Sequence, residues 1–291
     1  MKPIIAPLTN PAQRSGLILA VLSAITFSTV GLFTKGVDAG AWEVIFWRGT
    51  AAVLFTAAWL VWRNARADGW AGEWAAMGRP GWYAALIGAC ATSAFIPALK
   101  LTTIANVTLI WSAAPLLTAL MGWVWMGEKP GARTLIAGAI CLIGVSLALG
   151  IPTVGSSWQG DALALVMTVL MSGMLLIYRR WPATPAAIPA ALSSLFLLPF
   201  ALILGAPFAV VAAELLILLA FGLVFAIASI TMLAAAQRLP ASTVSLIGLL
   251  EFPLALLWAA LVFGEQMTVP TLLGAAMILA ALYWSQRAAR G

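Results

Sequence analysis

The chain has 291 residues, of which 63% are apolar and only 8% are charged. A soluble globular protein carries roughly 45–50% apolar and about 25% charged residues, so this composition excludes a water-soluble fold and also an intrinsically disordered chain. There is no histidine, which excludes histidine metal sites, catalytic triads and imidazole proton relays. The two cysteines, Cys90 and Cys141, both lie in apolar runs, which excludes an aqueous disulfide scaffold.

Long apolar runs separated by short gaps fill the chain. A membrane span needs about 20 mainly apolar residues, and lipid offers no partners to an open backbone, so each run is expected to form a helix. A β-barrel would instead show alternating segments of about ten residues. We therefore predict an all-α polytopic membrane protein with ten transmembrane helices, at residues 15–35, 42–62, 81–100, 104–126, 132–150, 160–178, 185–206, 212–236, 241–263 and 268–285. The gaps leave no room for a separate soluble domain.

The basic residues predict the orientation of these helices. In a soluble protein a net charge of +6 would suggest a nucleic-acid partner, but here the lysines and arginines lie in gaps between apolar runs. With the N-terminus inside, 12 basic residues fall on the cytoplasmic side, and only Lys35 and Lys100 fall at the outer ends. Cytoplasmic loops carry an excess of Lys and Arg, so we expect no nucleic-acid partner and both termini in the cytoplasm.

Two stretches of the chain match at an offset of 137 residues: residues 106–142 correspond to residues 243–279. The matched strings are VTLI and VSLI (107–110, 244–247), GE and GE (127–128, 264–265), and TLIAGA and TLLGAA (134–139, 271–276). The front of each half matches at an offset of 144, with Gly16, Leu19, Ser28 and Lys35 facing Gly160, Leu163, Ser172 and Arg179. Apolar helices resemble one another by composition alone, yet the equal spacing of these strings favours a true repeat.

The repeat predicts two halves of five helices each, residues 1–150 and 151–291, in one compact transmembrane unit. Because five is odd, the second half enters the membrane from the opposite side. Such inverted-topology repeats are typical of secondary transporters, whose binding site lies near the membrane midplane between the halves.

At these residues the chain resembles the EamA-type members of the drug/metabolite transporter superfamily, and among them the YddG-type amino-acid exporters. The resemblance covers both halves. Its strings are FSTVGLFTKG (27–36), ALKLTTIANVTLI (98–110), APLLTALMGWVWMGEK (114–129), RLPASTVSLIGLLEFP (238–253) and LALLWAALVFGE (254–265). The family usually has Glu-Pro in helix 9, whereas here Phe252 separates Glu251 from Pro253.

The resemblance implies a bacterial inner-membrane exporter with ten helices and a central cavity. Helices 1–4 and 6–9 would line the cavity, helices 5 and 10 would pack outside it, and hairpins 3–4 and 8–9 would move to open one side or the other.

Two charged residues lie inside apolar runs, where ionisable groups are costly and by default functional. Arg48 is a candidate clamp for a substrate carboxylate, since a guanidinium binds carboxylates bidentately. The alternatives are an ion pair with Glu43 or Glu251, or a side chain that reaches the outer surface. Glu251 is a candidate contact for a substrate amine or a carrier of protons, with a neutral helix-packing carboxyl group as the alternative.

Further candidates are small polar and aromatic side chains at cavity depth, which equally suit helix packing. The predicted substrate-binding residues are Arg48, Glu251, Trp47, Ser28, Asn106, Trp111, Ser112 and Trp258. Prolines inside helices remove a backbone hydrogen bond and kink the helix, and paired interruptions point to binding sites and hinges. The predicted hinges are Pro97, Pro115, Pro199 and Pro253, with static kinks as the alternative.

These features favour a secondary transporter that exports small metabolites by alternating access through a central cavity. The expected substrates are amino acids, including aromatic or other apolar ones, or their analogues. No Walker motif is present, so a gradient of substrate or protons would drive it, and we expect no metal, cofactor or catalytic residue. The alternatives are a flippase for lipids or lipid-linked sugars and, less favoured, an intramembrane enzyme. Besides the substrate, the lipid bilayer is the expected partner, and the chain is expected to be a monomer or a weak homodimer.

Overall fold

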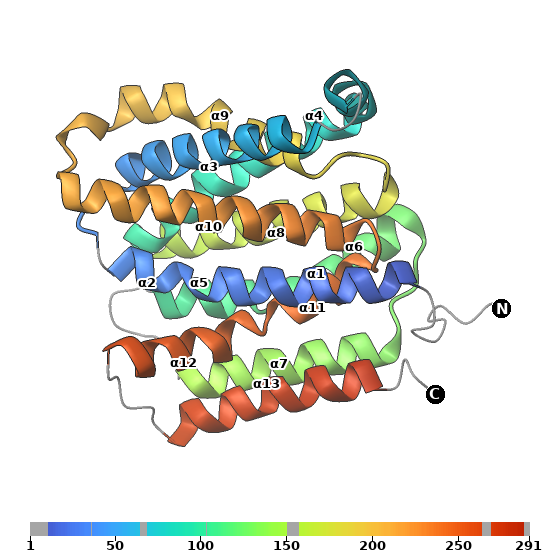
Figure 1. The fold of residues 1–291 in the computed structure, drawn as a ribbon. Coiled ribbons are helices and arrows are strands. Elements are labelled where there is room, and N and C mark those ends of the chain that lie inside the picture. The colour runs from blue at the N-terminus through green and yellow to red at the C-terminus, as the bar shows by residue number, and fades with distance from the viewer. Residues whose placement is uncertain are drawn as a thin grey trace.

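The computed structural model describes residues 11–35, 37–64, 69–102, 104–149, 157–263 and 269–287. These residues form a bundle of helices that run along a common direction (Figure 1). The first half contains α1 (Pro11–Ser28), α2 (Val30–Lys35), α3 (Ala41–Asn64), α4 (Gly69–Leu101), α5 (Ile104–Trp111), α6 (Ala114–Met126) and α7 (Ala132–Leu149). The second half contains α8 (Trp158–Arg180), α9 (Ala187–Leu204), the short 3₁₀ helix η1 (Pro207–Ala209), α10 (Ala212–Ala236), α11 (Ala241–Gly248), α12 (Glu251–Phe263) and α13 (Val269–Arg287).

Seven helical stretches of the described chain are long and apolar enough to cross a membrane. Two of these stretches join a pair of helices, α5 with α6 and α11 with α12, while α7 and α13 contain shorter apolar segments. Every one of the ten runs expected from sequence overlaps at least one helix. The prediction of an all-helical membrane protein is therefore confirmed.

One helix lies partly in the gap that the sequence left open between residues 63 and 80. Helix α4 begins at Gly69 and bends at Gly78, whose φ of 48° and ψ of −166° are not helical. A positive φ is strained for any residue with a Cβ, so glycine suits this bend. Pro80 follows and restricts the backbone before it. The residues before Gly78 form a separate arm that turns away from the bundle (Figure 1).

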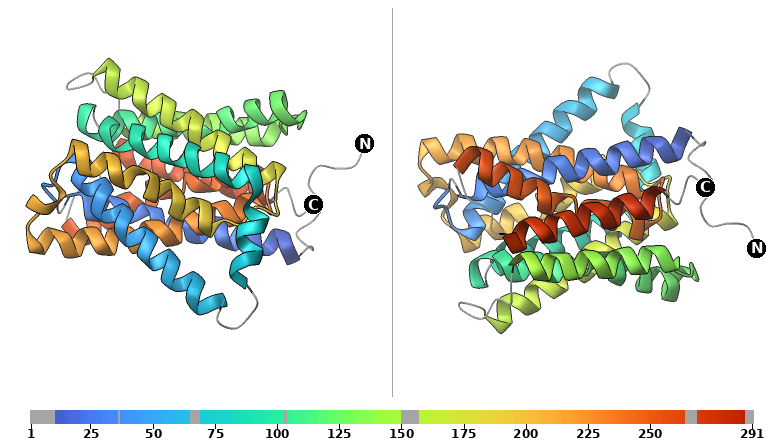
Figure 2. Two further views of the ribbon diagram at one scale, coloured as in Figure 1. Left: turned by 90° about the horizontal axis from the view of Figure 1, so that it is seen from above. Right: turned by 90° about the horizontal axis from the view of Figure 1, so that it is seen from below.

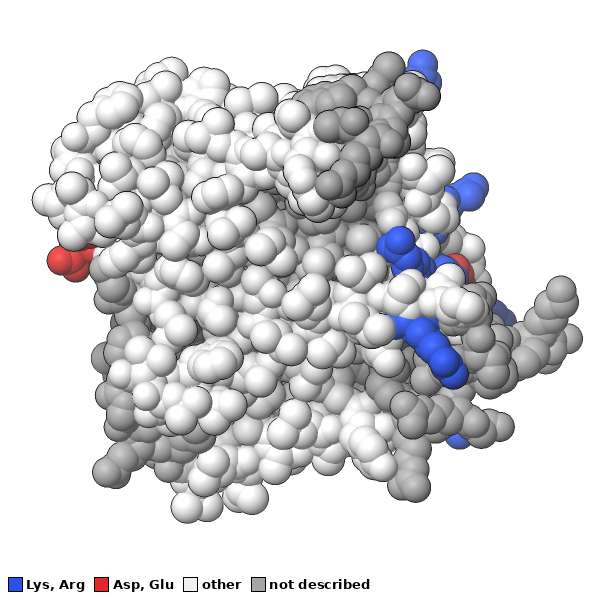
Figure 3. Space-filling view, viewed as in Figure 1, with Lys and Arg blue, Asp and Glu red and all other residues white. Residues whose placement is uncertain are grey.

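The described basic side chains gather at one end of the bundle (Figure 3). Helix α1 begins and α13 ends at this end (Figure 1). The basic residues lie near helix limits that meet there: Arg14, Arg79, Lys129, Arg133, Arg179, Arg180 and Arg238. Glu128 adds one carboxylate, which pairs with Arg179 at 3.4 Å. We call this the basic end, and we call the other end, where α3, α8 and α10 begin with Glu43, Asp161 and Glu214, the acidic end.

Helix limits in the two halves repeat at the offset found in the sequence. Helices α5 and α6 span 104–111 and 114–126, and adding 137 gives the limits of α11 and α12, 241–248 and 251–263. The breaks at Ser112-Ala113 and Leu249-Leu250 therefore occupy equivalent positions. Pro115 and Pro253 each follow a break closely, one residue out of register.

Contacts between helices repeat in the same way. Helix α1 packs on α10 as α8 packs on α4, and α3 packs on α10 as α9 packs on α4. A Cβ added to Gly16 would lie 2.9 Å from Cγ of Leu239, and one added to Gly160 would lie 2.8 Å from the backbone nitrogen of Thr102. Gly16 and Gly160 are 144 residues apart and Thr102 and Leu239 are 137 apart, so these close approaches are equivalent.

The last helices of the two halves, α7 and α13, lie side by side along one flank of the bundle (Figure 2). Their backbones nearly touch, because a Cβ on Gly274 would lie 2.2 Å from the carbonyl oxygen of Gly144. Small residues permit such close packing where lipid gives no hydrophobic drive to association. The small-residue faces of these helices are thus occupied within the chain.

Candidate substrate cavity

A cavity of about 400 Å³ lies between the two halves. Binding pockets for small molecules commonly measure roughly 300–1,000 Å³ and have mainly apolar walls with a few placed polar groups. Helices of both halves contribute to the wall, which carries the aromatic side chains Phe27, Phe95, Trp111, Phe221, Phe225 and Phe252. Among the described residues of the wall, Arg48 and Glu251 are the charged ones.

Arg48 comes from α3 and is 2% exposed. It lies seven residues into the helix, about 10 Å from its start at a rise of 1.5 Å per residue, and is the one described α3 residue in the cavity wall. Its Nε is buried without a hydrogen-bond partner, and no ion pair joins Arg48 to another described residue. The guanidinium therefore faces the cavity with hydrogen-bonding capacity to spare.

Close packing between α3 and α10 fixes the position of Arg48. Gly222 of α10 allows it, because an added Cβ would lie 2.5 Å from the carbonyl oxygen of Arg48 and 2.4 Å from Cβ of Ala51. This approach brings the guanidinium over the ring of Phe225, with Cζ 4.0 Å from the ring centroid. A cation over an aromatic face is attracted by the ring, by roughly 2 kcal/mol where water is excluded.

Glu251 lies at the first position of α12, directly after the break that ends α11. The start of a helix carries unsatisfied N–H groups and a partial positive charge, which favour a carboxylate there. The side chain is half-buried and faces the cavity. Glu43, the other suggested partner of Arg48, instead accepts a hydrogen bond from the Ala206 backbone nitrogen at 2.7 Å.

Three other predicted site residues, Ser28, Trp111 and Ser112, lie in the cavity wall. Trp258 stands behind the wall: its Nε1 donates to Oγ of Ser28 at 2.9 Å. The Ser28 hydroxyl in turn donates to the Ile25 carbonyl at 2.6 Å. The bond between Trp258 and Ser28 ties the end of α1, where the helix is interrupted before α2, to α12.

Two predicted site residues are placed away from the cavity wall. Asn106 donates through Nδ2 to Oδ1 of Asp161 at 3.0 Å, beside Thr102, whose hydroxyl donates to the same oxygen at 2.7 Å. Trp47 donates through Nε1 to the Pro207 carbonyl at 2.7 Å. Asn106 thus ties α5 to the first turn of α8, and Trp47 ties α3 to η1.

The four predicted hinge prolines differ in surroundings. Pro97 is half-buried inside α4, and Pro115 is buried in the first turn of α6. Pro253 is half-buried in the first turn of α12. Pro199 lies inside α9 and is exposed, and α9 contributes no described residue to the large cavity.

Phe221 and Phe225 contact Arg48 but were not singled out from the sequence. They stand four residues apart on α10, so they share one face of that helix. Helix α10 is apolar on all sides, which hides from the sequence which face turns inward. The glycine between them, Gly222, was the available signal for a close helix contact.

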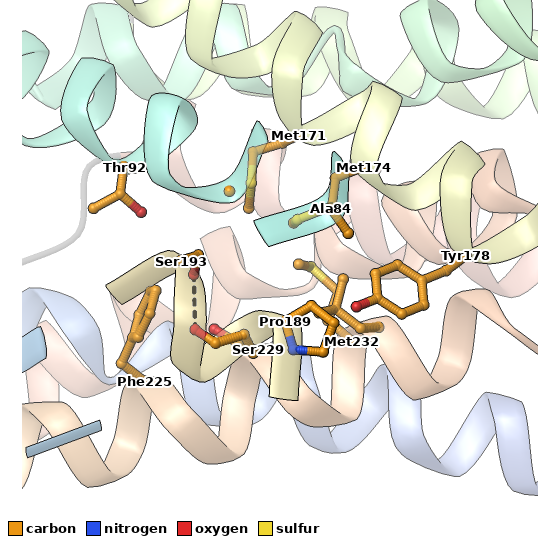
Figure 4. A pocket seen from close by; sticks show the side chains of 13 residues that line it. Ala84, Thr92, Met171, Met174, Tyr178, Pro189, Ser193, Phe225, Ser229 and Met232 are labelled. Carbon is orange, nitrogen blue, oxygen red and sulfur yellow. Dashed lines mark hydrogen bonds between the residues drawn. The ribbon is translucent and has the colours of Figure 1, made fainter. Parts of the chain in front are cut away.

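A second cavity of about 30 Å³ lies beside the large cavity and is lined by residues of α4, α8, α9 and α10 (Figure 4). It has room for about one water molecule. The two cavities share Thr92, Met171, Phe225 and Met232. Beyond these residues lies buried Tyr178, whose hydroxyl donates to the Pro185 carbonyl at 3.3 Å. Met174 and Tyr178 thus line the second cavity but not the large one.

A helical membrane protein with a large cavity between two repeated halves has the form of a transporter of small molecules. The model of the EamA-like transporter family matches twice, at residues 14–150 and 158–286. The chain belongs to the EamA-like transporter family.

One solved structure, titled only as a crystal structure of a protein, resembles this chain with a TM-score of 0.80. The alignment has 20% identity and covers 95% of this chain and 98% of the other. At that identity the likeness supports the fold alone. A comparison with curated proteins finds no match.

Proposed function

We propose that the protein is a secondary transporter that carries amino acids, including aromatic and other apolar ones, across the bacterial inner membrane. The observation that carries this proposal is Arg48, a buried guanidinium without an ion-pair partner among the described residues, in the wall of an otherwise largely apolar cavity. A substrate with one carboxylate and an apolar body complements that site.

A zwitterion complements both charged residues of the wall. Its carboxylate would bind Arg48, and its ammonium group would bind Glu251, contributed by the other half of the chain. Charge-assisted hydrogen bonds of this kind are the strong ones, above all in a bidentate Arg–carboxylate pair. The aromatic wall would hold the side chain. This substrate class agrees with the resemblance to YddG-type amino-acid exporters.

Ten spans in two inverted repeats complete the proposed architecture. Support comes from the equivalent glycine contacts. Gly16 lies in the second turn of α1, which begins at the basic end, whereas Gly160 lies in the first turn of α8, which begins at the acidic end. The gathering of arginine and lysine side chains at the end where α1 starts and α13 finishes supports cytoplasmic termini.

Alternating access would use the two broken helices. The α5–α6 and α11–α12 breaks flank the cavity at equivalent positions, and Ser112 and Leu249 within them belong to its wall. Pro115 and Pro253 follow the breaks, and Pro97 and Pro199 lie inside α4 and α9. A broken helix can bend with less loss of backbone hydrogen bonding than a continuous one.

Uptake of a panel of labelled amino acids into proteoliposomes tests the proposal, with and without a pH gradient. We expect saturable uptake of apolar and aromatic amino acids, with KM raised on the order of 30-fold or more in Arg48→Ala, because a buried charge contact is lost. Glu251→Gln should weaken uptake of amino acids more than that of their N-acetyl analogues.

Lys129→Ala is the matched control, because it removes an exposed positive charge from the loop between α6 and α7. It should transport as the wild type does. Stimulation by the pH gradient would add proton coupling. Folded protein that moves no amino acid would overturn the proposed substrate class and direct the search to lipids and lipid-linked sugars.

A further inference from the structure

Two phenylalanine rings contact the buried Arg48 side chain, and two more pack against them. We call Phe27, Phe33, Phe221 and Phe225, which come from α1, α2 and α10, the phenylalanine cluster. The guanidinium carbon of Arg48 lies 4.0 Å from the centroid of Phe225 and 5.4 Å from that of Phe221. Phe27 of α1 meets Phe225 edge-on at 6.1 Å. Phe33 of α2 stacks on Phe221 at 5.6 Å with an interplanar angle of 2°.

The rings solve an electrostatic difficulty. A guanidinium withdrawn from water needs a compensating partner, and no described carboxylate pairs with Arg48. The negative faces of Phe225 and Phe221 supply part of that compensation. The cluster can thus hold a positive charge in the cavity wall before any substrate arrives.

The same contact leaves the hydrogen-bonding groups of Arg48 free. A guanidinium presents five N–H donors in its plane, and a cation–π contact engages its charge without supplying an oxygen acceptor. The Nε of Arg48 has no acceptor among the described residues. A protein carboxylate in this position would satisfy both the charge and the donors, and so would compete with a substrate.

Resting on the proposed function, we infer that Phe225 is a positioning residue. It holds the Arg48 guanidinium charged and oriented toward the cavity, so that the site selects substrates carrying a carboxylate over the corresponding amines. Both rings belong to the cavity wall, and Phe225 has this role rather than Phe221 because its ring centroid lies closer to Cζ of Arg48, at 4.0 Å against 5.4 Å. Phe27 packs against its edge and restrains the ring.

The test replaces Phe225 with phenylalanine analogues that carry one, two or three ring fluorines. Fluorine withdraws electrons from the ring face and weakens cation binding while shape changes little. Phe95 lies in the same cavity wall without a described contact to Arg48, so the same series at Phe95 is the matched control. Uptake of labelled tryptophan and of tryptamine, which lacks the carboxylate, is measured for each protein in proteoliposomes.

We expect KM for tryptophan to rise stepwise with fluorination at Phe225, roughly ten-fold over the series, with little change in the maximal rate. KM for tryptamine should stay within about two-fold, and the Phe95 series should show no graded change. Phe225→Tyr keeps an electron-rich ring and should transport tryptophan with a KM near that of the wild type. Phe225→Leu removes the ring and should raise KM for tryptophan at least as much as three fluorines do.

The outcomes separate the inference from the function beneath it. If the wild type transports tryptophan and fluorination at Phe225 leaves KM unchanged, the inference is overturned and the proposed function stands. An equal rise for tryptophan and tryptamine would also overturn it, since the ring would then act by packing. Failure of the folded wild type to move any amino acid would remove the proposed function, and the inference with it.

Discussion

The two halves of the chain share one backbone plan but carry different side-chain chemistry at equivalent places. Arg48 of α3 corresponds to the uncharged stretch 192–194 of α9, and Glu251 of α12 corresponds to Ala114 of α6. Each half thus supplies one charge that the other lacks. A repeated frame therefore encloses a cavity whose lining is not repeated, as an asymmetric substrate requires.

The hydrogen bond between Trp258 and Ser28, which lies behind the cavity wall, also has no counterpart in the other half. In one half Trp258 donates a hydrogen bond to Ser28. The equivalent residues in the other half are Met121 and Ser172, and the Ser172 hydroxyl is buried without a partner among the described residues. Met121 instead packs near Gly173, whose added Cβ would lie 3.7 Å from the Met121 methyl group.

Replacing Arg48 by the residue type of the other half should have the largest effect on transport. Arg48→Ser gives α3 the residue type found at 193 and 194, and it removes the cation from the cavity wall. We expect KM for amino acids to rise on the order of 30-fold or more, since truncating one partner of a buried charge pair costs roughly 2–5 kcal/mol. Proteoliposome uptake measures this, and a KM within two-fold of the wild type would contradict it.

The equivalent glycines should tolerate a methyl group unequally. An alanine Cβ at Gly160 would meet the Thr102 backbone, whereas one at Gly16 would meet side-chain atoms of Arg238 and Leu239. Overpacking typically costs about 1–3 kcal/mol, and side chains yield more readily than backbone. Thermal unfolding in detergent should therefore show a larger loss of stability for Gly160→Ala than for Gly16→Ala; the reverse order would contradict the packing described here.

Trp258→Met gives the second half of the chain the residue type found at the equivalent position of the first half, Met121. The loss of the hydrogen bond to Ser28 should lower the free energy of unfolding by about 1–2 kcal/mol. Combined with Ser28→Ala, the change should be less than the sum of the two single effects, because both variants remove the same bond. A fully additive pair in thermal unfolding would show that the bond contributes nothing.

The smallest effect concerns the two equivalent serines, which should respond with opposite sign. Ser28→Ala removes a hydroxyl that accepts from Trp258 and should destabilise the protein. Ser172→Ala removes a buried hydroxyl that lacks a partner among the described residues, and should be neutral or stabilising by up to about 1 kcal/mol. Equal destabilisation by both variants would mean that Ser172 is bonded in the folded protein.

The repeat was predictable because sequence strings and helix breaks obey the same offset of 137 residues. The depth of Arg48 and Glu251 within apolar runs also indicated their candidacy, since charges in lipid are rare enough to stand out. The direction in which a side chain points was harder to predict. Asn106 and Trp47 have the right depth but bond to Asp161 and to the Pro207 carbonyl.

Two further features, the role of Phe225 and the helical arm before Gly78, were not predicted from the sequence. A helix that is apolar all round gives no periodic signal for its inward face, so Phe225 looked like any other apolar residue of α10. The arm before Gly78 is short and carries charge, unlike a membrane span, so its helical structure was not expected.

The glycine contact between α7 and α13 bears on how the molecule would assemble from pieces. Neither helix carries a charged cavity residue, and of the two only α7 reaches the wall, through Val145. Their backbones meet at Gly144 and Gly274, where no side chain intervenes. Two separately synthesised halves would therefore still share a recognition face that uses no charged residue of the cavity, so their association would not require Arg48 or Glu251.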